Sequence, residues 1–282
     1  TPTTEIYILS LHDALPIYAF NGNVIWSMHS AGVRDLVMND QYLIGLRAAQ
    51  LDIYSPKNVV YLSHVAEGTD PINQSIAIST LFVLNNAETA DANATFKMYK
   101  SNGTAMEVNV ADLEGGAPCP TCDPETATSE FQLTVDAGQS VAFATTGENP
   151  NLVTGWAEVT SDVPLSATSV FRTTESGTIL FEAGVGSTGV TGKAQLFITG
   201  NDYESVGGLY NTGVFMVNPM DEDAVIDVTF TSADGSTDLT TTVNLAAGTH
   251  TAKFVNTADG LFPTLSGFNV TGTLTLTSDI PF

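Results

Sequence analysis

The feature that most constrains the fold is an internal repeat in the last four-fifths of the chain. Leu81–Asn85 (LFVLN) matches Val214–Asn218 (VFMVN), and an acidic loop follows each segment. The later matches, in chain order, are Ser101–Thr104 with Ala233–Ser236, Leu133–Ser140 with Val243–His250, and Thr154–Leu165 with Thr271–Phe282. Because all the matches keep their order, the sequence indicates two copies of one structural unit.

Both copies have the pattern of antiparallel strands joined by tight turns. Short runs rich in Val, Thr, Phe and Ile alternate with polar residues, as in Ala94–Tyr99 and Gly272–Thr277. Asn102-Gly103 and Asp234-Gly235 occupy equivalent positions, and such dipeptides favour hairpin turns. No stretch keeps a 3.6-residue apolar period over three turns. We therefore predict an all-β fold with two tandem antiparallel β-sandwiches of the immunoglobulin-like type.

The repeat also predicts the domain boundaries. The first sandwich is expected at residues 58–175 and the second at residues 176–282. The first copy carries an insertion of about 22 residues within 107–130. It also continues past Leu165 into a strand-like segment with no counterpart in the second copy, so we expect the second sandwich to be truncated.

The first 57 residues differ in sequence pattern from the rest of the chain. Residues 18–57 are rich in aromatic side chains and contain four strand-like runs that resemble one blade of a β-propeller; an irregular β-hairpin lead-in is the alternative. A single blade needs neighbours to bury its faces. Residues 1–17 resemble translated sequencing-adapter read-through at the end of a metagenomic fragment. On this interpretation a signal peptide has been lost from the fragment.

The charge balance disfavours polyanionic partners. The chain has 31 Asp and Glu against 8 Lys and Arg, a formal net charge of −23. Such a surface repels phosphate, so nucleic acid and anionic lipid are not expected as partners. No apolar run reaches the roughly 18 residues of a membrane span, so no membrane insertion is expected. Proteins, cell-surface glycans and divalent cations remain as candidate partners.

Three segments together carry a resemblance to known proteins. They are LFVLN with its acidic loop, the turn VDAGQSV, and VTGWAEVTSDVPL with the VFR that follows it. They resemble a tandem β-sandwich region common near the C-termini of large secreted bacterial proteins. The resemblance covers about residues 59–282 and implies an extracellular or cell-surface accessory module, with no catalytic residues to carry over. The cysteine-bearing insertion and the absent final strand depart from that pattern.

Cys119 and Cys122 form a C-x-x-C motif inside the insertion. No predicted helix is present to lower a thiol pKa for redox chemistry, and no second cysteine or histidine pair is present to complete a zinc site. A local disulfide in an oxidising compartment is the preferred interpretation, with free thiols as the alternative.

Acidic loops of the second copy are the candidate metal ligands. Calcium takes six to eight oxygen ligands, which clustered carboxylates and loop carbonyls can supply. The candidate calcium ligands are Asp221, Glu222, Asp223, Asp234 and Asp238. They lack the spacing of an EF-hand, and solvated turns are the alternative. No other cofactor is expected.

No catalytic motif is present, so we expect no enzyme activity. The sequence has neither a G-x-S-x-G nor an H-E-x-x-H motif. His250, where the first copy has Ser140, is expected at an exposed turn. Trp26 and Trp156 are expected in the core rather than as platforms for sugars.

Similarity between the copies lies mainly in strands and turns, which favours a non-catalytic extracellular structural, adhesion or protein-docking module of a larger secreted bacterial protein. One alternative is a glycan- or calcium-binding accessory domain of a secreted hydrolase. Another is the appendage of a propeller enzyme whose active site lies in missing blades. A site belonging to one copy would lie in a copy-specific loop, and Glu107–Glu130 and Leu261–Phe268 are the two such segments.

Overall fold

The computed structural model describes residues 58–112, 125–200 and 211–282 in full, and within residues 1–57 the backbone of the strands alone. The described elements are strands, with one short 3₁₀ helix, η1 (Pro263–Leu265). The predicted all-β, sandwich-like fold is confirmed. The chain divides into two compact units, Thr1–Asn58 and Val59–Phe282.

The first unit contains a four-stranded antiparallel sheet and a hairpin. The sheet has the order β1-β4-β5-β6, with bounds β1 (Ile8–Ser10), β4 (Val33–Met38), β5 (Leu43–Arg47) and β6 (Gln50–Tyr54). The hairpin pairs β2 (Ile17–Tyr18) with β3 (Val24–Trp26). Strand β1 falls within the segment that resembles read-through. The propeller-blade interpretation stays a prediction, and the side chain of Trp26 lies outside the described residues.

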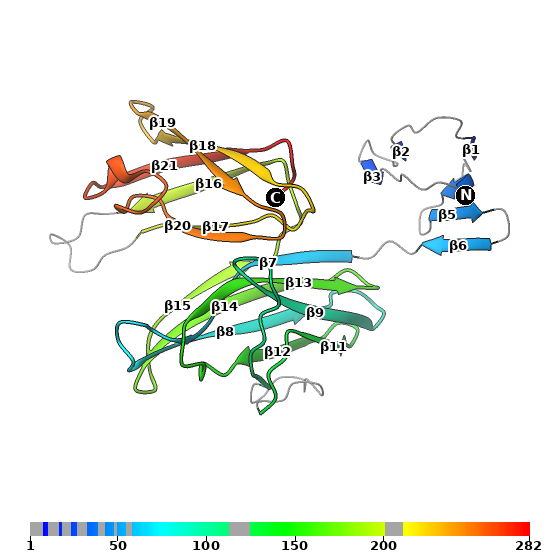
Figure 1. Ribbon diagram of the computed structural model, residues 1–282, viewed down its shortest axis with the longest axis horizontal. Coiled ribbons are helices and arrows are strands. Elements are labelled where there is room, and N and C mark those ends of the chain that lie inside the picture. Colours follow the sequence, from blue (N-terminus) through cyan, green and yellow to red (C-terminus); the bar gives the residue numbers. More distant parts are fainter. Residues whose placement is uncertain are drawn as a thin grey trace. The chain divides into compact units, whose positions relative to one another are not determined.

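The second unit begins with a nine-stranded sheet that curls into the first sandwich (Figure 1). Its strands are β7 (Asn58–Thr69), β8 (Ile76–Asn85), β9 (Ala92–Lys100), β10 (Val110–Asp112), β11 (Glu130–Val135), β12 (Ser140–Thr145), β13 (Val153–Ser161), β14 (Ser166–Glu175) and β15 (Thr178–Gly186). The order is β10-β12-β8-β7-β13-β9-β11, with β14 paired to β8 and β15 to β14. The long strand β7 joins the two layers because it pairs with both β13 and β8.

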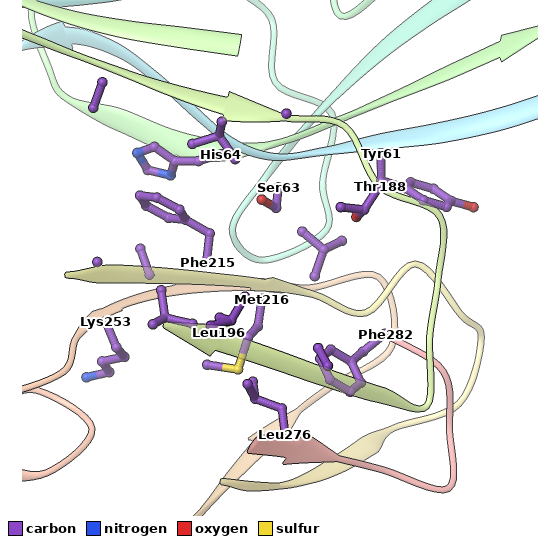
Figure 2. A pocket seen from close by; sticks show the side chains of 18 of the residues that line it. Tyr61, Ser63, His64, Thr188, Leu196, Phe215, Met216, Lys253, Leu276 and Phe282 are labelled. Carbon is purple, nitrogen blue, oxygen red and sulfur yellow. The ribbon is translucent and has the colours of Figure 1, made fainter. Parts of the chain in front are cut away.

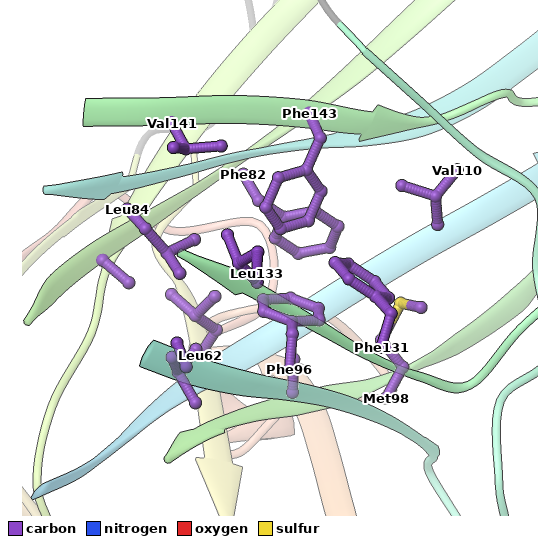
Figure 3. Close-up of a cluster of buried hydrophobic side chains, with 14 of the residues drawn as sticks. Leu62, Phe82, Leu84, Phe96, Met98, Val110, Phe131, Leu133, Val141 and Phe143 are labelled. Atoms are coloured by element: carbon purple, nitrogen blue, oxygen red, sulfur yellow. The ribbon is translucent and has the colours of Figure 1, made fainter. Parts of the chain in front are cut away.

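Alternating apolar residues of these strands form an aromatic core (Figure 3). The rings of Phe82, Phe96, Phe131 and Phe143 contact one another with centroids 4.9–5.3 Å apart. The insertion also takes part in this core, since Val108 and Val110 are buried, as is Met106 just before it. At its start, therefore, the insertion is a structural part of the first sandwich.

The second sandwich has two sheets. One has the order β16-β21-β18-β19, and the other pairs β17 with β20. The bounds are β16 (Lys193–Gly200), β17 (Gly213–Val217), β18 (Ala224–Ser232), β19 (Asp238–Leu245), β20 (His250–Phe254) and β21 (Val270–Thr277). These orders repeat β7-β13-β9-β11 and β8-β12 of the first sandwich. The copy-specific segment before η1 closes the core, where Leu261 and Phe262 are buried.

Two buried asparagines define the register between the copies. The Asn86 Nδ2 donates to the carbonyl oxygens of Ala90 (2.8 Å) and Val135 (2.9 Å), and the Asn218 Nδ2 donates to the carbonyl oxygens of Glu222 (2.7 Å) and Leu245 (3.0 Å). Both side chains are fully buried. Asn218 therefore corresponds to Asn86, and the match of Leu81–Asn85 with Val214–Asn218 was wrong by one residue.

A threonine pair supports this corrected register. The Thr80 hydroxyl donates to the Ala66 carbonyl oxygen (2.8 Å), and the Thr212 hydroxyl donates to the Thr199 carbonyl oxygen (2.7 Å). The register matters because a shift of one residue exchanges the two faces of a strand. In the corrected register, the buried Phe82 and Leu84 correspond to the buried Val214 and Met216.

Candidate functional site

The predicted ligands do not come together as one site. Cys119 and Cys122 lie outside the described residues, so the disulfide stays a prediction. Asp221, Glu222 and Asp223 precede β18, whereas Asp234 and Asp238 lie in the β18–β19 hairpin. The two groups are separated by the length of β18, nine residues, or about 30 Å. No single ion can contact both.

Two of these carboxylates accept hydrogen bonds that stabilise turns. The Asp223 Oδ1 accepts a hydrogen bond from the Ala247 N–H (2.9 Å), as the Asp91 Oδ1 does from the Ala137 N–H (2.9 Å) in the first copy. The Asp234 Oδ1 accepts hydrogen bonds from the hydroxyl and N–H of Ser236, which lower the pKa of Asp234 to about 2. Within the described part of the chain, no three His, Cys, Asp or Glu side chains form a group that could hold a metal. A calcium site at either end of β18 stays a prediction.

The most unusual arrangement of side chains lies where the two sandwiches meet. The Trp156 ring of β13 stacks on Tyr99, with centroids 4.4 Å apart, and its Nε1 donates to the Gly248 carbonyl oxygen (3.2 Å). A Cβ added to Gly103, which has φ +82°, would lie 2.9 Å from the same Gly248 oxygen. Trp156 is 3% exposed, so its predicted burial is confirmed. It belongs to the junction between the sandwiches rather than to the aromatic core.

Two histidines complete this junction. His64 of β7 stacks on Phe215 of β17, with centroids 4.2 Å apart, and contacts Phe171 edge-on. The His64 Nδ1 lies 3.4 Å from the His250 Nε2, and the His250 Nδ1 lies 3.0 Å from the Ser101 Oγ. His250 is 6% exposed. The expectation of an exposed turn was wrong because the second copy's Ala-Gly turn packs against the first sandwich.

The Ser101 hydroxyl lies 3.0 Å from each of three atoms, the Thr154 carbonyl oxygen, the Thr154 hydroxyl oxygen and the His250 Nδ1. One arrangement of protons satisfies the whole chain of groups: Ser101 donates to the Thr154 carbonyl oxygen and accepts from the His250 Nδ1–H, and the His250 Nε2 accepts from the His64 Nδ1–H. The direction of each histidine bond depends on the tautomers of the two rings.

Burial keeps both imidazoles neutral. Desolvation, with a smaller contribution from His250, lowers the pKa of His64 to about 3, and desolvation lowers the pKa of His250 to about 4. The neutral rings therefore pack and hydrogen-bond between the two sandwiches.

A cavity of about 980 Å³ adjoins the junction (Figure 2). The first sandwich contributes Tyr61, Ser63 and His64 to its wall, and Phe181 and other residues of β15. The second sandwich contributes side chains from β16, β17, β20 and β21, mostly apolar. Among the described residues of the wall, the one charged side chain is that of Lys253, whose Nζ donates to the Asp259 carbonyl oxygen (3.1 Å).

Sequence reasoning missed this junction and cavity. The replacement of Ser140 by His250 was a usable signal, because it is a copy-specific polar residue in an otherwise repeated turn. The partner His64 had no such signal, since nothing in the sequence shows that β7 lies against the second copy.

A scan against protein-family models and searches of curated proteins and of solved structures found no match to this chain. Among the described residues, no helix has the length and apolar character needed to span a membrane.

Proposed function

We propose that the chain is a non-catalytic structural and protein-docking module of a larger secreted bacterial protein. In this role the paired sandwiches act as one folded support, and the surface beside their junction receives a partner. The extracellular location and the bacterial origin belong to the proposal and rest on the resemblance of residues 59–282 to tandem β-sandwich regions. The N-terminal sheet would then form a unit of its own beside this module, such as a propeller blade.

The observation that carries the proposal is how the copies differ. Residues shared by the copies hold turns and strand ends, as the Asn86 and Asn218 side chains do. Residues found in one copy join the sandwiches or close a core, as His250, Trp156 and Met106 do.

The alternative is an accessory domain that binds glycan or calcium. It is favoured by the acidic loop at Asp221–Asp223, where three exposed carboxylates lie together in the sequence. The same loop also contributes the Asp223 carboxylate to a turn, which a structural role explains.

A ligand screen of the full chain separates the two functions. We expect no saturable binding on a glycan array and no rise of the melting temperature in millimolar calcium. Saturable glycan binding that disappears when residues 112–127 are deleted, with the circular dichroism spectrum retained, would contradict the structural proposal. A calcium-dependent rise that Asp221→Asn abolishes would contradict it equally.

A further inference from the structure

The junction between the sandwiches is distinct from the core of each sandwich. The two clusters of buried apolar side chains share no residue, and neither includes His64, Trp156, Phe215 or His250. Across the junction, the ring of His64 stacks on that of Phe215 (Figure 2). Separation of the sandwiches at this junction would therefore leave the contacts within each core intact.

Hydrogen bonds across the junction gather on one turn of the second sandwich. The His250 N–H donates to the Ser101 carbonyl oxygen (3.0 Å), and the Trp156 Nε1 donates to the Gly248 carbonyl oxygen (3.2 Å). The His250 side chain contacts the Ser101 Oγ through Nδ1 (3.0 Å) and the His64 Nδ1 through Nε2 (3.4 Å). Each of these contacts involves Gly248 or His250, so a change of charge on His250 acts where the sandwiches are joined.

The contact between the two imidazoles requires neutral rings. A neutral imidazole has one N–H donor and one acceptor nitrogen, so one proton can lie between the His64 Nδ1 and the His250 Nε2. An imidazolium donates from both nitrogens, so two imidazoliums would bring two N–H groups and two positive charges together. Both side chains are buried, which disfavours even a single charge on the pair.

The elements around the pair supply no counter-charge among the described residues. Their charged and titratable residues are Tyr61 and Glu67 of β7, Lys97, Tyr99 and Lys100 of β9, Glu158 of β13, Arg172 and Glu175 of β14, and Lys253 of β20. None of them contributes to the lowered pKa values of the pair, which burial causes, together with His250 in the case of His64. Glu67, on the same strand as His64, accepts from the Gly147 N–H instead (2.9 Å).

We propose that the junction is acid-sensitive: protonation of His64 and His250 separates the two sandwiches while each keeps its fold. The inference goes beyond the proposed function by giving the paired sandwiches two states, one joined at neutral pH and one separated in acid. It uses only contacts between described residues of the two sandwiches.

The direction of the pH effect follows from proton linkage. In the joined state the pKa is about 4 for His250 and about 3 for His64, whereas exposed imidazoles in the separated state have the ordinary value of 6.5. The separated state therefore binds more protons below pH 6.5, and acid favours it. With both histidines present, the ratio of joined to separated molecules should fall by up to about a hundredfold per pH unit.

Trp156 is the probe of separation, because it is buried at the junction. Trp26→Phe leaves Trp156 as the one tryptophan of the full chain. Its emission wavelength and its quenching by acrylamide are measured from pH 7 to about pH 4, alongside the far-UV circular dichroism spectrum. We expect the emission to move to longer wavelength and the quenching to rise below pH 6.5, with the circular dichroism spectrum retained.

Two double variants in this background test whether the junction histidines are responsible. His64→Gln/His250→Ser should remove the acid transition. His12→Gln/His29→Gln removes two histidines outside the described residues and is the matched control, which should keep the transition at the same pH. The single variant His250→Ser retains one of the two groups, so its ratio of joined to separated molecules should fall by up to about tenfold per pH unit, and not a hundredfold.

The proposal is overturned if Trp156 shows no transition, or if the transition coincides with loss of the circular dichroism spectrum. It is equally overturned if His64→Gln/His250→Ser is joined at pH 7 and separates over the same pH range as the parent. A folded double variant already separated at pH 7 supports the proposal, because the pair then holds the sandwiches together. If the double variant does not fold, the steepness for His250→Ser decides, and steepness equal to that of the parent overturns the proposal. None of these results alters the ligand screen, so failure of this inference is distinguishable from failure of the proposed function.

Discussion

At the scale of single residues, buried polar side chains make equivalent hydrogen bonds in both copies. Asn86 and Asn218 each donate hydrogen bonds to two carbonyl oxygens, one in the following loop and one at the end of a strand. An unsatisfied buried polar group costs more than a typical hydrogen bond contributes. These positions should therefore be sensitive to substitution although they lie next to turns.

Asn86→Ala should lower the free energy of unfolding by about 2 kcal/mol, because it removes two hydrogen bonds made by a fully buried side chain. The matched control is Asn85→Ala, which removes an exposed side chain that accepts from the Ser140 hydroxyl (2.9 Å) and should cost under about 0.5 kcal/mol. Urea denaturation of the full-length variants measures both values. Equal losses would contradict the register assigned to the repeat.

The histidine pair predicts a dependence of stability on pH. The unfolded chain protonates these histidines near pH 6.5, whereas the folded chain does not until about pH 4 for His250 and about pH 3 for His64. Since the unfolded state binds more protons in this window, stability should fall as the pH is lowered from 6.5 to 4, by up to about 1.4 kcal/mol per pH unit for each histidine.

The double variant His64→Gln/His250→Ser should be less stable at pH 7 but should lose less stability between pH 6.5 and 4.5. The nearby Glu67 has a pKa raised by desolvation and contributes with the opposite sign, equally in both proteins. Urea denaturation across this pH range gives the two slopes. Equal slopes would show that the junction does not hold neutral histidines.

At the scale of elements, close packing between neighbouring strands explains a glycine that recurs in both copies. A Cβ added to Gly155 of β13 would overlap the Tyr99 carbonyl oxygen of β9, and one added to Gly272 of β21 would overlap the Thr231 carbonyl oxygen of β18. Both glycines follow a threonine in the matched segments at Thr154 and Thr271. The shared T-G is therefore a packing requirement of the sandwich.

Gly272→Ala should lower the melting temperature and reduce the free energy of unfolding by about 1–3 kcal/mol. The backbone atoms that the added Cβ would overlap cannot move aside as a flexible side chain can. Gly186→Ala in β15 is the matched control, because an added Cβ there meets nothing within 4 Å. Thermal unfolding monitored by circular dichroism compares them. A loss as large for Gly186→Ala would refute the packing explanation.

At the scale of the whole molecule, local features could be predicted from the sequence, whereas contacts between distant segments could not. The alternation in Ala94–Tyr99 and the glycine turns are local, and β9 and both turns formed as expected. The slip of one residue at Val214–Asn218 arose because apolar similarity does not distinguish the two faces of a strand. The junction and the cavity depend on which faces of distant segments meet, as with His64 and His250, which are 186 residues apart.

The central claim is that the two sandwiches form one supporting unit through this junction. The most direct test is native-state hydrogen exchange of the full chain carrying Leu274→Ala, which removes a fully buried side chain of the second sandwich at a cost of about 2–5 kcal/mol. If the sandwiches are coupled, the slowest amides of β9 in the first sandwich will exchange faster together with those of β18. Acceleration in β18 with unchanged exchange in β9 would show that the sandwiches are independent and would contradict the account.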